Sequence, residues 1–131
     1  MTTELGFLAA TVILGLLHLM VDSHLISFQL GYRWTGSNRE QPMPPLRGVA
    51  NRVDQAYTNF METFPFFATV VLAAHLAGRH DALTLCGAQL YFWGRVGYVL
   101  AAAVGFGLVR SVLFFNTAVS GIILFLIALI R

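Results

Sequence analysis

The segment NRVDQAYTNFMETFPFF, residues 51–67, decides how the whole chain folds. Charged and amide side chains crowd its first half, and the apolar run that follows continues to Leu76. At the roughly 100° per residue of an α-helix, four of the polar side chains fall within an arc of about 80°. They are Arg52, Gln55, Asn59 and Glu62. The pattern predicts a long helix with one polar stripe on a largely apolar surface.

The composition around this segment is that of a membrane protein. The chain has 131 residues, of which 57% are hydrophobic and 11% are charged, whereas a soluble domain has about 25% charged residues. The mean hydropathy is +0.73. A chain of this length has room for four membrane spans of about 20 residues each.

Four apolar stretches predict helices at about residues 5–28, 49–76, 82–104 and 111–130. The connections at 77–81 and 105–110 are short, which forces the helices that they join to run antiparallel. The first connection, about residues 30–47, is the long one and contains three prolines. We therefore expect an all-α membrane protein, an up-down bundle of four transmembrane helices that forms a single domain over residues 1–131.

The distribution of arginine predicts the orientation in the membrane. The chain has no lysine, and most of its arginines lie in or beside the first and third connections, namely Arg33, Arg39, Arg47, Arg52 and Arg110. Basic residues concentrate on the cytoplasmic side, so both termini are expected on the non-cytoplasmic side. The net charge is only +2, which leaves no basic face for a nucleic-acid partner.

The polar stripe cannot face lipid, because a charge at the centre of the bilayer costs at least about 2.5–3.5 kcal/mol. In the third stretch, YFWGRVGYV places Arg95 at a depth similar to that of Glu62. We expect these two residues to form an ion pair, within one chain or between subunits. Three readings of the stripe remain open: structural contacts between helices, a binding cleft open to the cytoplasm, or the pathway of a small transporter or proton channel.

Three short motifs resemble the MAPEG family, the membrane-associated proteins of eicosanoid and glutathione metabolism. RVDQAYTNFMETFPF is similar to the family pattern of a basic residue, then A-x-x-N-x-x-E, then an aromatic and proline segment. GRVGYV follows in the third stretch, and Arg110–Ser111 precedes the last one. The resemblance covers essentially the whole chain, including its length and its connections.

The resemblance implies a homotrimer that binds glutathione at subunit interfaces from the cytoplasmic side. The positions that match the family's glutathione-binding residues are Arg52, Asn59, Glu62, Arg95 and Tyr98. Arg110 matches the arginine that stabilises the glutathione thiolate, which is the catalytic role. The implied function is a membrane glutathione transferase or peroxidase that acts on lipophilic small molecules, with membrane lipid around it.

Several positions depart from the catalytic members of the family. Gln55, Tyr57 and Thr58 stand where those members carry basic residues, and Ala102 stands where they carry a tyrosine. The alternative is a non-catalytic membrane protein that binds lipid or a partner on the same scaffold. No metal site is expected, because His18 and Asp22 in the first stretch have no further ligands nearby. We expect those two residues to make hydrogen bonds between helices.

Overall fold

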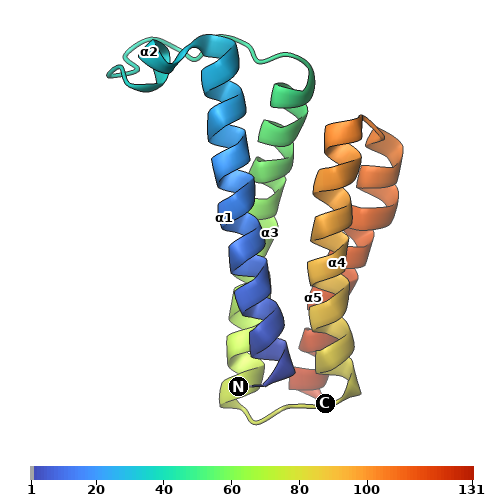
Figure 1. Ribbon diagram of the computed structural model, residues 1–131. Coiled ribbons are helices and arrows are strands. Elements are labelled where there is room, and N and C mark those ends of the chain that lie inside the picture. Colours follow the sequence, from blue (N-terminus) through green and yellow to red (C-terminus); the bar gives the residue numbers. More distant parts are fainter. Residues whose placement is uncertain (1) are drawn as a thin grey trace.

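Four long helices pack side by side in the computed structural model, which describes residues 2–131. They are α1 (Thr3–Leu30), α3 (Gly48–Leu76), α4 (Ala82–Val104) and α5 (Phe115–Ile130). A short helix, α2 (Tyr32–Thr35), lies in the first connection, and a π-helical segment, η1 (Val109–Phe114), leads into α5. Figure 1 shows the up-down arrangement, with both termini at one end and α2 at the other. The all-helical prediction is confirmed, and residues 2–131 contain no strand.

Local capping signals set the helix ends. The Asp81 side chain accepts hydrogen bonds from the backbone N–H groups of Leu83 and Thr84, and Thr84 Oγ1 accepts one from the Asp81 N–H. This reciprocal arrangement satisfies backbone donors that have no partner inside the helix. At the other end of α4, Gly105 adopts φ 98°, a conformation that glycine reaches without the steric cost of a Cβ. The short turn after it returns the chain into η1.

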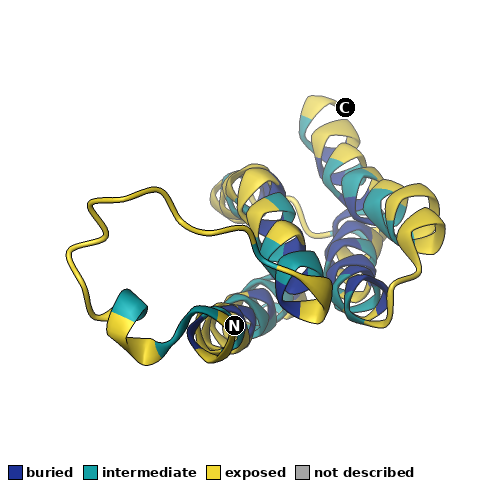
Figure 2. Cartoon of the chain, turned by 90° about the horizontal axis from the view of Figure 1, so that it is seen from above, coloured by how far each residue is buried: buried dark blue, intermediate teal, exposed yellow. Residues whose placement is uncertain are grey.

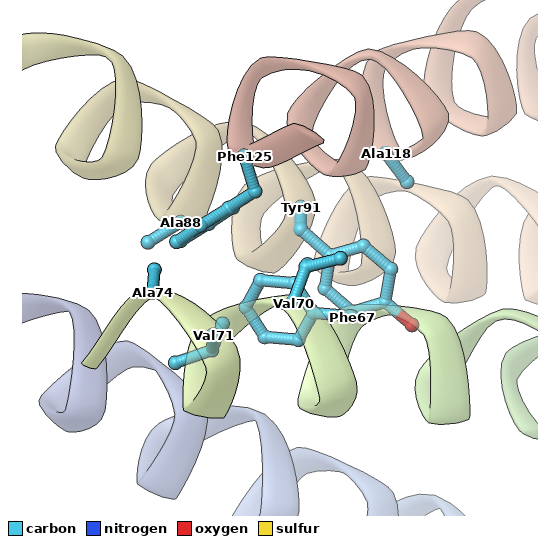
Figure 3. Packing of buried hydrophobic residues seen from close by; sticks show 8 residues of the cluster. All are labelled: Phe67, Val70, Val71, Ala74, Ala88, Tyr91, Ala118 and Phe125. Carbon is cyan, nitrogen blue, oxygen red and sulfur yellow. The ribbon is translucent and has the colours of Figure 1, made fainter. Parts of the chain in front are cut away.

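A buried aromatic cluster joins the three C-terminal helices near the end that carries the termini. The rings of Phe67 in α3 and Tyr91 in α4 stack with centroids 4.0 Å apart, and Phe125 from α5 meets Phe67 edge-on at 6.1 Å. Figure 3 shows the small residues Ala74, Ala88 and Ala118 filling the space around them. The Tyr91 hydroxyl is 2.8 Å from Thr63 Oγ1, so the one polar atom of the cluster has a partner.

Helices α4 and α5 approach each other backbone to backbone. A Cβ placed on Gly87 would lie 2.7 Å from the Gly121 carbonyl oxygen, and a Cβ on Gly121 would lie 2.8 Å from the Tyr91 backbone nitrogen. Small residues permit such contact between helices, and in a membrane close packing replaces the hydrophobic effect as the source of association.

Replacing Gly121 by alanine is therefore expected to destabilise the protein by about 1–3 kcal/mol, because the new methyl group must push the two helices apart. Thermal unfolding in detergent, followed by circular dichroism, measures the loss. The matched control is Gly6→Ala in α1, where a Cβ would meet nothing within 4 Å. An equal response of the two variants would contradict the close packing of α4 against α5.

The outer surface of the bundle is strongly apolar. In Figure 2 the exposed residues lie on the outward sides of the helices, and the buried ones turn toward the neighbouring helices. On α1, Ile13, Leu16 and Leu17 are each close to 60% exposed, which a water-facing helix would not tolerate as a continuous stripe. Within residues 2–131, two helices are long and apolar enough to cross a membrane by length and composition: Thr3–Leu30 and Val109–Ile130.

One predicted contact between helices is present on the inner side of α1. The His18 Nε2–H group donates to the Val53 carbonyl oxygen of α3 at 3.1 Å. The His18 ring also meets the Tyr57 ring edge-on, with centroids 5.3 Å apart. The hydrogen bond ties α1 to α3 and gives the buried histidine a structural role.

Candidate functional site

Apart from Arg52, the polar residues of α3 on and beside the stripe fall into two sets. Asn59 and Thr63 face α4 and hydrogen-bond to its side chains. The other set is exposed and consists of Gln55, Thr58 and Glu62. The hydrogen bonds that Gln55 and Thr58 donate stay within α3 itself. Residues that form one stripe in the sequence pattern therefore have different surroundings in the fold: some contact α4 and the others lie on the outer surface.

Arg95 is the most deeply buried charged residue of the site. The residue is only 2% exposed, and its Nη1 donates a hydrogen bond to Asn59 Oδ1 at 2.7 Å. The predicted ion pair with Glu62 is wrong within one chain: the ion pairs of residues 2–131 are His80–Glu4 and Arg131–Asp81. The physical reason is the rotation of α3, which turns Asn59 toward α4 and Glu62 away from it. A pair between subunits stays a prediction.

Two guanidinium groups lie against one tyrosine ring. The Arg95 Cζ is 4.3 Å from the centre of the buried Tyr98 ring, and the Arg110 Cζ is 5.8 Å from the same centre. The Phe60 ring closes the other side, 5.6 Å from the Arg95 Cζ. Cations are attracted to the faces of aromatic rings, so Tyr98 holds two like charges in one place. Arg95, Tyr98, Arg110 and Asn59 form the cluster that we call the guanidinium site.

The guanidinium site contains hydrogen-bond donors that nothing satisfies. The Nε atoms of Arg95 and Arg110 are both buried, and neither has a hydrogen-bond partner among residues 2–131. The contact from Arg110 Nη2 to Ser111 Oγ is long, at 3.4 Å. A buried unsatisfied donor on a charged group costs more than about 1–3 kcal/mol. Such donors are expected where a ligand acceptor completes the site.

The π-helical segment η1 positions Arg110. Within η1, Phe114 lies directly on Gly97 of α4, where any Cβ would overlap its ring. π-Helical turns are rare and occur frequently at functional sites. The sequence analysis predicted neither the π-helix nor the contact of Phe114 with Gly97. The second glycine of GRVGYV, Gly97, was nevertheless a signal that two helices approach closely there.

Arg52 lies apart from the guanidinium site. Its Nε donates to the Ala102 carbonyl oxygen at 3.0 Å, and its Nη2 donates to the Ala103 carbonyl oxygen at 3.1 Å. These carbonyls are at the C-terminal end of α4, where backbone acceptors have no partner in the helix and the dipole favours a cation. Arg52 therefore closes a helix end, and the structure does not bring it together with Arg95.

The geometry gives a cationic cluster around Tyr98, in which Asn59 holds Arg95 in place before any ligand arrives. It can bind an anion and can stabilise negative charge that forms on a nucleophile. The model of the MAPEG family matches residues 7–130 of the chain. A search of curated proteins returned no match. Because the family match covers nearly the whole chain and the all-helical fold agrees with it, the chain belongs to the MAPEG family.

Proposed function

We propose that this MAPEG protein binds glutathione at the guanidinium site and activates its thiol for reaction with lipophilic electrophiles. The observation that carries the proposal is the pair of buried Nε donors on Arg95 and Arg110, which lack partners among the described residues. Family membership supports the choice of glutathione, because the resemblance implies this ligand for its catalytic members.

The electrostatics of the site favour an anion. Two guanidinium groups share the Tyr98 ring, and among residues 2–131 the side chain that hydrogen-bonds Arg95 is the neutral amide of Asn59. No carboxylate of residues 2–131 forms an ion pair with either arginine. Two like charges held together in a partly dry environment repel, and an anion between them removes the repulsion.

Bound there, glutathione would supply a thiol nucleophile and two carboxylates. A guanidinium group next to a thiol favours the thiolate, which is the reactive form. The role of Arg110 in this proposal is to donate a hydrogen bond to the sulfur, while Arg95 is held in place by Asn59. Charge-assisted hydrogen bonds of this kind are about twice as strong as neutral ones.

We further propose that all four long helices cross the membrane, with the guanidinium site open to the cytoplasm. The helices Thr3–Leu30 and Val109–Ile130 are long and apolar enough to cross a membrane. Helices α3 and α4 differ from these two by carrying the polar residues of the site. In Figure 1 the termini and the turn after α3 lie at one end, opposite the arginine-rich first connection. That arrangement supports a multi-pass protein with both termini on the non-cytoplasmic side.

Association of three copies belongs to the same proposal. Glu62, Gln55 and Thr58 are exposed on α3, in a helix that would otherwise present them to lipid. A charged side chain within the bilayer requires protein or water as a neighbour. A homotrimer, as the family resemblance implies, would cover this face and would allow Glu62 to meet a basic residue of another subunit.

A second candidate function is lipid binding without catalysis. An apolar cavity of about 320 Å³ lies between α4, η1 and α5, with Trp93, Leu90 and Phe114 among its walls. It suits an acyl chain, either as part of a lipophilic substrate or as the ligand itself. The absence of basic residues at Gln55, Tyr57 and Thr58 favours this second function.

Titration of glutathione into the detergent-purified protein, by calorimetry and by stopped-flow absorbance of the thiolate, tests the first function. We expect saturable binding together with a thiolate signal, because the free donors favour the ionised sulfur. S-methylglutathione is the matched control, since it keeps both carboxylates and has no thiol, and it should bind without that signal. If glutathione does not bind and lipid co-purifies, the second function replaces the first.

A further inference from the structure

A second polar site lies at Asp22 of α1, outside the guanidinium site. The residue is 5% exposed, and its Oδ1 is buried with no hydrogen-bond partner among residues 2–131. Asp54 of α3 is a second acidic residue in its neighbourhood. Neither carboxylate forms an ion pair within the described part of the chain. A buried carboxyl oxygen without a partner is costly, so a hydrogen-bond donor or a cation is expected beside it.

Asp22 also lines a cavity of about 210 Å³ between α1, α2 and the first connection. The walls of the cavity are held in place, because two hydrogen bonds connect α2 to α1. They join Ser27 Oγ to Thr35 Oγ1 at 2.7 Å and His24 Nδ1 to the Tyr32 hydroxyl at 3.0 Å. The volume is several times the roughly 30 Å³ that a water molecule occupies in the liquid. The cavity therefore has room for a small organic group.

Arg39 supplies a positive charge to the same cavity. Its Nε and Nη2 donate to the Thr35 carbonyl oxygen at 3.2 and 2.9 Å, and its Cζ lies 5.1 Å from the centre of the Trp34 ring. These contacts hold the guanidinium away from Asp22 and leave its remaining N–H groups for an acceptor. One cavity thus offers a buried acceptor at Asp22 and a fixed donor at Arg39.

We propose that this cavity binds the headgroup of a zwitterionic lipid that carries a primary ammonium group, as in phosphatidylethanolamine. The ammonium group donates hydrogen bonds to Asp22, and the phosphate accepts them from Arg39. A quaternary ammonium has no N–H to give to Oδ1, and the Trp34 face that could attract it already carries Arg39. A metal ion fits less well, since the described residues contain no group of three or more histidine, cysteine or acidic side chains that could hold one.

The position of the cavity favours a lipid over a soluble ligand. Leu19 and Met43 line the cavity and are also 41% and 45% exposed on the outer surface. The apolar outer face of α1 continues from Leu19 to Leu16 and Met20. Acyl chains can therefore run along α1 while the headgroup occupies the cavity at the end of the bundle that carries α2.

Native mass spectrometry of the protein, loaded with phosphatidylethanolamine or phosphatidylcholine of identical acyl chains, tests the proposal. We expect the wild type to retain the ethanolamine lipid at least about tenfold better, which corresponds to about 1.4 kcal/mol. Asp22→Asn should bring that ratio near one. Arg39→Gln should lower retention of both lipids and leave the ratio unchanged, because both headgroups contain the phosphate. Glu40→Gln, an exposed carboxyl of the same connection, is the matched control.

Equal retention of the two lipids by the wild type would overturn the proposal. This comparison needs no variant, so it stands even if Asp22→Asn does not fold. Fluorescence of Trp34 in a Trp93→Phe background, titrated with O-phosphoethanolamine, distinguishes the source of the headgroup. A response to the soluble compound as strong as that to the lipid would overturn the lipid assignment. Neither result bears on glutathione binding at the guanidinium site.

Discussion

Replacing Arg110 by alanine is expected to lower kcat for conjugation or peroxide reduction by about 10²- to 10³-fold, the loss that follows removal of one preorganised donor to a developing negative charge. The buried Arg110 Nε has no partner among the described residues, so the donor is free for the thiolate. Steady-state kinetics with glutathione and a lipophilic electrophile measure the change. The thiolate absorbance should disappear in parallel, because the same N–H group favours the ionised sulfur.

Two further variants make this result specific. Arg79→Ala, an exposed arginine in the turn at the other end of the bundle, should leave kcat unchanged. Arg110→Lys keeps the charge but loses the planar fork of donors, so it should restore only part of the activity. Full activity in Arg110→Ala would exclude a catalytic role for Arg110. A rise in KM with unchanged kcat would show that Arg110 contributes to binding alone.

Replacing Asn59 by leucine is expected to destabilise the protein by about 3 kcal/mol. Arg95 is almost fully buried, and the Asn59 amide oxygen at 2.7 Å is the side-chain acceptor that it has among residues 2–131. Without that oxygen a buried charge loses its hydrogen bond, and the loss of one partner of a buried charge is much more costly than the loss of a surface contact. Denaturant or thermal unfolding in detergent measures the difference.

The matched control is Asn116→Leu in α5. Asn116 is exposed, and its amide donates to the Val112 carbonyl oxygen of its own helix, so the change should stay within about 0.5 kcal/mol. Asn59→Asp should preserve the fold, because a carboxylate still accepts from Arg95. If Asn59→Leu were as stable as its control, Arg95 would have to find another partner, and Glu62 of a neighbouring subunit would become the first residue to examine.

Most of the helical architecture could be predicted from the sequence. The apolar stretches are long and sharply bounded by Asp81, Gly105 and the prolines of the first connection, so the helices begin and end close to their predicted limits. The short helix α2 and the π-helical segment η1 could not be predicted. Both depend on contacts that helical periodicity does not reveal: Thr35 of α2 hydrogen-bonds to Ser27, 8 residues earlier, and Phe114 of η1 packs on Gly97 of α4.

The structure brings together some of the residues that the sequence singled out for the site. Asn59, Arg95, Tyr98 and Arg110 meet in the guanidinium site, whereas Arg52 closes the end of α4 and Glu62 faces outward. Helical spacing places Asn59 and Glu62 only about 60° apart around α3. Spacing alone could not choose between them as the neighbour of Arg95.

Local composition was enough to specify a helical membrane protein, because length, hydropathy and capping depend on residues close together in the chain; the likeness to the MAPEG family came from the short motifs. The tertiary packing decided which polar side chains meet. The close fit of Ala56 and Phe67 against α4 sets the rotation of α3, and that rotation turns Asn59 inward and Glu62 outward. The rotation of a helix depends on how its side chains pack against those of its neighbour. It therefore cannot be predicted from the residue pattern of either helix alone.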